Sequence, residues 1–219
     1  MAYQFTAASS QSLVVGSAPV TAEPLTMACW VRPSVTTNGV ILSIGTNGGT
    51  SRWQLNHGAT SSDFAQNTAN IAAFSVDSIG TANGASTDNN VYTVNSWVHA
   101  ASVFSGSNNR VAYANGIAGT SNTISRTVSG VNRLHIAARI ATTVGAFASG
   151  DIAEVGIWNA ALTAAEIASL AAGMTCDKVR PQSLVFSAPL VRELQDVKGG
   201  LTITNNNTAT VANHPRVYA

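Results

Sequence analysis

The chain has 219 residues, which is enough for one large domain of the all-β kind. Hydrophobic residues make up 45% of it and charged residues only 10%, a balance that excludes an intrinsically disordered chain. The formal net charge is +1 and the only lysines are Lys178 and Lys198, so the sequence lacks the concentrated basic charge that is typical of nucleic-acid-binding proteins.

The N-terminal stretch MAYQFTAASSQSLVV has no basic segment followed by an apolar one, so we expect no Sec-type signal peptide. No stretch approaches the ~20 apolar residues that a membrane-spanning helix needs, and no membrane partner is expected. The two cysteines, Cys29 and Cys176, are too few for a disulfide framework, and we expect buried free thiols.

Short apolar runs separated by turn-forming residues recur along the first half of the chain. They predict strands at 26–32, 40–44, 51–55, 71–76 and 91–94, with a polar loop at 77–90. Many short strands at such spacing indicate a sandwich or a barrel.

Residues 97–104 and 110–114 are predicted as two successive strands. Asn115-Gly116 follows them, and this pair favours a type I′ turn because both central residues of that turn need positive φ. His99 lies in the first strand with no second metal-binding or catalytic side chain at a suitable spacing. Packing in the sheet is therefore favoured over a catalytic role for His99.

The segment 132–140 (NRLHIAARI) alternates with a period of two. Leu134, Ile136 and the apolar residues after them are predicted to face the core, and Arg133, His135 and Arg139 the other side. This basic stripe is interpreted either as a solvated face or as a contact for an anionic sugar, a carboxylate or a neighbouring subunit.

The segment 162–173 is the one convincing helix. Thr163 and Glu166 have the spacing of a capping box, and Gly173 stands where a left-handed C-terminal residue is favoured. Its apolar face is short, so we expect the helix to lie on the sandwich and not to form its core.

The pattern of residues along the sequence changes after Cys176. We interpret 1–176 as one domain and 177–219 as a C-terminal extension that packs on the domain or on a neighbour, because it is too small for a second core.

Three stretches resemble the laminin G-like (LamG/LamGL) family. They are LTMACWVRP at 25–33, WVHAASVFSGSNNRVAYANG at 97–116 and GDIAEVGIWNAALTAAEIASL at 150–170. The resemblance covers roughly residues 1–173 and implies an all-β, antiparallel two-sheet jelly-roll sandwich of the concanavalin A-like type, with one short helix and a C-terminal strap.

That fold family includes glucanases, which place catalytic carboxylates on one strand as E-x-D-x-x-E or a close variant. No such motif occurs here, and Asp151 and Glu154, three residues apart, are predicted to face opposite sides of a strand. Motifs of serine hydrolases, zinc proteases and P-loop enzymes are absent from the sequence as well. We therefore expect that the protein is not an enzyme.

The fold family also includes calcium-binding domains. Oxygen ligands for such an ion are offered by the loop residues Asp63, Asp77, Asp88 and Asn90, without a tight ligand spacing. No other cofactor is expected. Trp53 is interpreted either as an exposed ring that stacks on a sugar or, together with Leu55, as a core residue.

The end of the chain, with SLVFSAPL and HPRV, resembles endings of such domains in phage-encoded proteins. This implies a non-catalytic structural protein of a phage virion, such as a capsid decoration, head-fibre or tail component, whose partners are other virion proteins and copies of itself. The alternative is a lectin-like adhesion module that binds surface glycans, with or without calcium.

Overall fold

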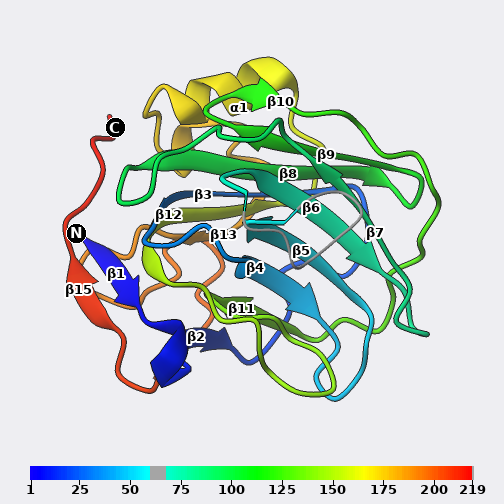
Figure 1. Cartoon of the computed structure of the whole chain (residues 1–219), viewed down its shortest axis with the longest axis horizontal. Helices are drawn as coiled ribbons and strands as arrows, with labels where there is room; N and C mark the ends of the chain where they lie inside the picture. Colours follow the sequence, from blue (N-terminus) through cyan, green and yellow to red (C-terminus); the bar gives the residue numbers. More distant parts are fainter. Residues whose placement is uncertain (60–67, 219) are drawn as a thin grey trace.

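The computed structural model describes residues 1–59 and 68–218, which fold as a sandwich of two antiparallel sheets (Figure 1). In this part of the chain, sheet A runs in the order β10 (Ile117–Ala118), β9 (Asn109–Ala114), β8 (Val98–Gly106), β3 (Leu25–Pro33), β12 (Gly150–Trp158), β1 (Ala2–Phe5) and β15 (Thr210–Ala212), and β13 (Leu184–Ala188) also pairs with β12. The predicted all-β, two-sheet sandwich is confirmed.

Sheet B faces sheet A across the core. It runs in the order β14 (Ile203–Asn206), β2 (Ser12–Val15), β11 (Arg133–Ile136), β4 (Gly39–Gly45), β5 (Arg52–His57), β6 (Ile71–Val76) and β7 (Ala82–Ser86). Two short 3-10 helices, Ala7–Ser9 and Cys176–Lys178, lie in the connections.

The core between the sheets is built by strand alternation, because successive side chains of a strand point to opposite faces. In β3, Met27, Cys29 and Val31 belong to the core and are at most 1% exposed. The side chains of Trp30 and Arg32, which alternate with these core residues, point away from the core. We call this side of the sheet the outer face of sheet A. The free thiols of Cys29 and Cys176 are both buried, as predicted.

The predicted helix is confirmed as α1 (Ala164–Ala171). Thr163 Oγ1 accepts a hydrogen bond from the Glu166 amide, and the Glu166 carboxylate accepts one from the Thr163 amide, so the capping box is complete. Ile167 and Leu170 are buried in a second apolar cluster. This cluster includes residues of the outer face of sheet A, so α1 covers one part of that face (Figure 1).

The C-terminal extension supplies strands to both sheets. Its strand β13 pairs with β12 and β15 pairs with β1 in sheet A, while β14 pairs with β2 in sheet B. Figure 1 shows β15 beside β1, with the two chain ends on the same side of the molecule. The boundary placed after residue 176 stays a prediction.

Three strand predictions were wrong in detail. Residues 91–94 form a turn and not a strand, and Tyr92 is buried there, with its hydroxyl 3.4 Å from His57 Nδ1. The predicted loop 77–90 contains β7, whose sequence ANGAS has none of the β-branched or aromatic residues that favour strands. Strand β11 ends at Ile136, because Ala137 has a φ of 66° and turns the chain out of the sheet.

Among the described residues, no helix is long and apolar enough to cross a membrane.

Three buried histidines predict that the fold is sensitive to acid. Burial lowers the pKa of His57 to about 4, of His99 to about 3 and of His135 to about 4, and each is at most 2% exposed. The ordinary value is about 6.5, so the unfolded chain binds these protons at higher pH than the folded chain does. The three neutral histidines therefore leave the fold at full stability above pH 6.5, and this stability is lost as the pH falls toward 4.

Urea unfolding at pH 7.5 and at pH 4.5 measures this effect. We expect the free energy of unfolding to fall by at least about 2 kcal/mol between the two. A His135→Gln variant should show a smaller fall, because it removes one of the three protonation sites. Equal stability at both pH values would contradict the prediction.

Candidate functional site

Polar side chains of three strands form a row across the outer face of sheet A. In the strand register, Gln4 of β1 lies opposite Asp151 of β12, and Asp151 lies opposite Arg32 of β3. Side chains directly opposite on one face of an antiparallel sheet have Cβ atoms about 5 Å apart. The row therefore brings together residues from both ends of the sequence.

An ion pair fixes the middle of the row. Arg32 Nε donates to Asp151 Oδ2 at 2.7 Å, and Arg32 Nη2 donates to the same oxygen. The Asp151 side chain is 1% exposed and that of Arg32 is 32% exposed. The other carboxylate oxygen, Oδ1, is buried and has no hydrogen-bond partner among the described residues. A buried carboxylate oxygen without a donor is uncommon, and here it is an acceptor with unused capacity.

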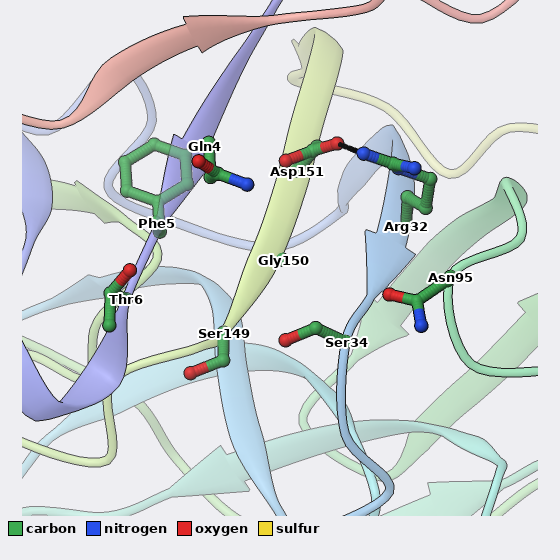
Figure 2. Close-up of a pocket in the computed structure, with 9 residues that line it drawn as sticks. All are labelled: Gln4, Phe5, Thr6, Arg32, Ser34, Asn95, Ser149, Gly150 and Asp151. Carbon is green, nitrogen blue, oxygen red and sulfur yellow. Dashed lines mark hydrogen bonds and ion pairs between the residues drawn. The ribbon is translucent and has the colours of Figure 1, made fainter.

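This free acceptor lies at a pocket of about 120 Å³ (Figure 2). Phe5 and Gly150 form part of the wall, and the remaining lining is polar: Gln4, Thr6, Arg32, Ser34, Asn95, Ser149 and Asp151. In Figure 2, one Asp151 oxygen meets Arg32 and the other points toward the side of the pocket where Gln4 lies. The pocket therefore offers a fixed acceptor surrounded by amide and hydroxyl groups.

Gly150 is required where the pocket forms. Its φ is 133°, and a Cβ at this position would lie 2.2 Å from the backbone oxygen of Arg32. A side chain would push β12 away from β3. The close approach of the two strands places Asp151 against Arg32.

Two tryptophans extend the row with aromatic surface. Arg32 Cζ lies 6.0 Å from the ring centroid of Trp97, which precedes β8. Trp30 and its cross-strand partner His99 have ring centroids 5.5 Å apart at 70°. Both tryptophans are half-buried, whereas His99 is 2% exposed, and burial lowers its pKa to about 3, so its ring is neutral near pH 7. A neutral, packed His99 agrees with its predicted role in the sheet.

A β-bulge separates Asp151 from Glu154. Glu154 has a φ of 51°, and the pairing of β12 with β3 shifts between Ala153 and Gly156. The simple alternation that predicted opposite faces for the two carboxylates therefore does not hold across this segment. Glu154 Oε1 lies 3.0 Å from His214 Nε2, while Asp151 is bound by Arg32, so each carboxylate has a different partner.

Trp53 lies in the core and is 0% exposed. Its Nε1 donates to Glu23 Oε1 at 2.7 Å. Of the two interpretations of Trp53, burial agrees with core packing, because a fully buried ring has no face for a sugar. The partly exposed tryptophans are Trp30 and Trp97 instead.

The predicted basic stripe is divided between a strand and a loop. Arg133 and His135 lie in β11, in the interior of sheet B, and Arg139 lies in the segment after it. His135 is 2% exposed, while Arg133 and Arg139 are half-buried. The structure thus keeps the three residues in one region but does not leave them on an open solvated face.

The candidate calcium ligands are not brought together. Asp77 precedes β7, and Asp88 and Asn90 follow it; five residues of strand span roughly 17 Å. Asp77 Oδ1 instead accepts hydrogen bonds from the Ile79 and Thr81 amides of its own turn. Asp63 lies outside the described residues, and calcium binding stays a prediction. Within 1–59 and 68–218, no cluster of three or more His, Cys, Asp or Glu side chains is placed to hold a metal.

The row on sheet A was not predicted from the sequence. Arg32 and Asp151 are 119 positions apart, and although each lies in a stretch that resembles the family, nothing in either stretch indicates that the two pair. The available signal was alternation: in WVRP, Trp30 and Arg32 follow the phase opposite to that of Cys29 and Val31.

Comparison with known proteins agrees with this architecture. A family model described as the concanavalin A-like lectin/glucanases superfamily (Laminin_G_3) matches residues 7–168. The chain belongs to this superfamily, as the resemblance in its sequence implied. A search of curated protein sequences finds no match.

Solved structures give the same result for the fold. A putative carbohydrate binding protein from Bacteroides ovatus has a TM-score of 0.66 at 16% identity, over 100% of this chain and 61% of that chain. A native heptameric SAP-like pentraxin from Limulus polyphemus has a TM-score of 0.64 at 15% identity, over 93% and 89%. The CBM40 of the Ruminococcus gnavus IT-sialidase, bound to α2,3 sialyllactose, has a TM-score of 0.55 at 12% identity, over 69% and 84%. At these identities the likeness establishes the fold.

The Arg32–Asp151 pair yields a stability prediction. Asp151→Asn keeps the shape of the side chain but removes the charge that Arg32 binds. We expect the free energy of unfolding in urea to fall by about 1.5–3 kcal/mol, the usual range for a hydrogen bond to a charged group. Asp88→Asn is the matched control, because Asp88 is exposed and has no ion pair among the described residues; it should change stability by less than about 0.5 kcal/mol. Equal effects of the two substitutions would argue against the role of the pair.

Proposed function

We propose that the protein is a non-catalytic carbohydrate-binding protein whose site is the row on the outer face of sheet A. The observation that carries the proposal is the free, buried Oδ1 of Asp151 at a polar pocket beside Trp97. Binding sites commonly combine an apolar or aromatic surface with a few fixed polar groups that orient the ligand.

The chemistry of the pocket favours a neutral sugar. Each sugar hydroxyl is both a donor and an acceptor, so one hydroxyl can donate to Asp151 Oδ1 while its neighbours bond to the amides of Gln4 and Asn95. The partly exposed ring of Trp97 offers a flat surface for the apolar face of a sugar ring. An acidic sugar is disfavoured at this position, because its carboxylate would meet the charge of Asp151.

Binding is favoured over glycoside hydrolysis by the state of the carboxylates. A retaining glycosidase needs one carboxyl group as the nucleophile and a second, about 5 Å away, as the acid. Asp151 is held by Arg32, and the Glu154 carboxylate lies against the ring of His214. The comparisons support this choice, since two of the similar structures are named as a putative carbohydrate binding protein and as a carbohydrate-binding module with a bound sugar.

A role in a phage virion stays a prediction from the sequence. A glycan-binding surface suits such a protein as well as it suits a free adhesion module, so the two roles do not compete. Copies of the chain arranged with symmetry would increase the avidity of a single weak sugar site.

Glycan binding by Trp97 variants tests the proposed site. We expect wild-type protein to bind neutral saccharides on a glycan array, and Trp97→Ala to bind the best of them at least about tenfold more weakly, the effect of losing a central aromatic contact. Trp97→Phe should retain part of the affinity, since a flat ring remains. Isothermal titration with the best saccharide gives the dissociation constants.

Tyr218→Ala is the matched control, because Tyr218 is an aromatic residue that is 66% exposed and lies at another pocket, with Met174 and Lys178, whereas Trp97 lies against Arg32 of the candidate site. Its affinity should equal that of wild type. Binding that Trp97→Ala does not weaken would place the site elsewhere, and an array with no bound glycan would overturn the proposed function. Repeating the titration with calcium and with EDTA tests the predicted calcium dependence.

Mass spectrometry of purified phage particles from the source tests the virion role. A fixed ratio of this chain to the major capsid protein is the expected result, and the ratio distinguishes a capsid position from a tail position. Absence of the chain from intact particles would refute a structural role in the virion.

A further inference from the structure

A second cluster of polar residues lies on sheet B, on the side away from the core. In β11 the core residues Leu134 and Ile136 alternate with Arg133 and His135. In β5 the core residues Trp53 and Leu55 alternate with Arg52 and Gln54 in the same way. We call Arg52, Arg133, His135 and Arg139 the basic cluster.

The strand register and one loop bring the basic cluster together. Arg133 lies opposite Gly45 of β4, and Gly45 lies opposite Arg52. Neighbouring strands are about 4.8 Å apart, so these two arginines start roughly 10 Å from each other, within the combined reach of their side chains. Arg139 and Gly145 exchange backbone hydrogen bonds of 2.8 and 3.2 Å, which close a loop beyond β11.

The same loop is attached to sheet B. The Ile140 amide donates to Ser43 Oγ at 3.3 Å, and Ser43 lies between His135 and Gln54 in the cross-strand row. The loop therefore places Arg139 over the sheet and buries the groups beneath it. His135 is 2% exposed and Gln54 is 0% exposed.

The cluster has no counter-charge in the described part of the chain. Arg32, Arg126 and Arg180 each form an ion pair, whereas Arg52, Arg133 and Arg139 form none. The charged neighbours that shift the pKa values of Arg52 and His135 are themselves arginines of the cluster. Burial, and then Arg139, lowers the pKa of Arg52 to about 10, and burial, and then Arg133, lowers the pKa of His135 to about 4.

Several polar atoms of this region also lack partners. Both ring nitrogens of His135, the Gln54 amide nitrogen and Arg139 Nε are buried without a hydrogen-bond partner in the described residues. Arg52 Nε donates to the amide oxygen of Gln54, so the amide nitrogen of Gln54 is the atom that has no partner. Most of these unpartnered groups are donors, and the missing partner is therefore an acceptor.

We propose that the basic cluster is a binding site for an oxyanion, namely the carboxylate or sulfate group of an acidic saccharide. Guanidinium groups bind such planar or tetrahedral anions with paired hydrogen bonds, and an anion would relieve the mutual repulsion of the arginines. Arg133 and Arg139 are half-buried and reach solvent, so an anion can meet their guanidinium groups at the edge of the cluster. The saccharide as the carrier of the anion rests on the proposed function; the oxyanion site itself does not.

Titration with simple anions tests the proposal. Wild-type protein is titrated with sodium glucuronate, sodium sulfate and glucose, with ionic strength held constant by sodium chloride. We expect binding of glucuronate and sulfate but not of glucose at this site, and Arg133→Gln and Arg139→Gln should each raise the dissociation constant at least tenfold. Arg216→Gln is the matched control, because Arg216 is exposed and has no ion pair in the described residues.

The stability of the ligand-free variants separates binding from structure. Removing one of several like charges should leave the melting temperature of Arg139→Gln at or above that of wild type. A clear fall in melting temperature, with anion binding unchanged, would overturn the proposal and assign the arginines a structural role. Absence of anion binding to the wild type would likewise overturn it, because the unpartnered groups would then be hydrated only.

Two further outcomes identify the carrier and isolate the site. Binding of sulfate without glucuronate would exclude a saccharide carboxylate and leave a sulfated saccharide as the carrier. Trp97→Ala should bind glucuronate like wild type, because Trp97 belongs to sheet A. The proposed neutral-sugar site and the oxyanion site can therefore fail or succeed separately.

Discussion

The close pairing of β3 with β12 at the centre of sheet A is the constraint on which the rest of the structure depends. Gly150 permits it, because any side chain there would collide with the backbone of Arg32. On one face, the pairing aligns Val31 with Ile152 in the core. On the other face, it aligns Arg32 with Asp151 and creates the row of polar and aromatic groups. The core and the candidate site are thus two sides of the same strand pair.

The scarcity of charge gives each ionic group unusual weight. Only 21 residues of 219, from 11 basic and 10 acidic ones, carry a formal charge. In such a protein a cation without an acidic neighbour cannot be dismissed as one of many surface charges. Arg32 of sheet A is neutralised by Asp151, while the arginines over sheet B lie near one another and a neutral histidine. The two sheets therefore present different electrostatic surfaces, one suited to hydroxyl groups and one to anions.

Local signals made the helix and one hairpin predictable. The capping box of Thr163 and Glu166 involves residues three positions apart, and Asn115 and Gly116 both adopt the positive φ that their turn needs. The end of β11 was not predictable, because Ala137 adopts positive φ in spite of its side chain. Nor was the Glu154 bulge, since it arises from the packing of β12 against its neighbours and not from an unusual residue.

The candidate site could not be predicted from sequence patterns for a different reason. Alternation indicated which face of β3 Arg32 occupies, but not which strand lies beside it. The partner, Asp151, is set by sheet order, and sheet order is a property of the whole chain. The family resemblance supplied the fold but no site residues. His135 shows the same limit: its face was predicted correctly, while its burial depends on the loop that follows.

The order of strands also has a consequence for synthesis on the ribosome. Strand β1 pairs with β12 and β15, and β2 pairs with β11 and β14, so neither N-terminal strand has a partner until residues beyond 130 have been made. The nascent chain must carry two apolar segments with open hydrogen-bonding edges for most of its translation. Folding is therefore dominated by contacts distant in sequence, which slows it and favours completion only after the last strands have emerged.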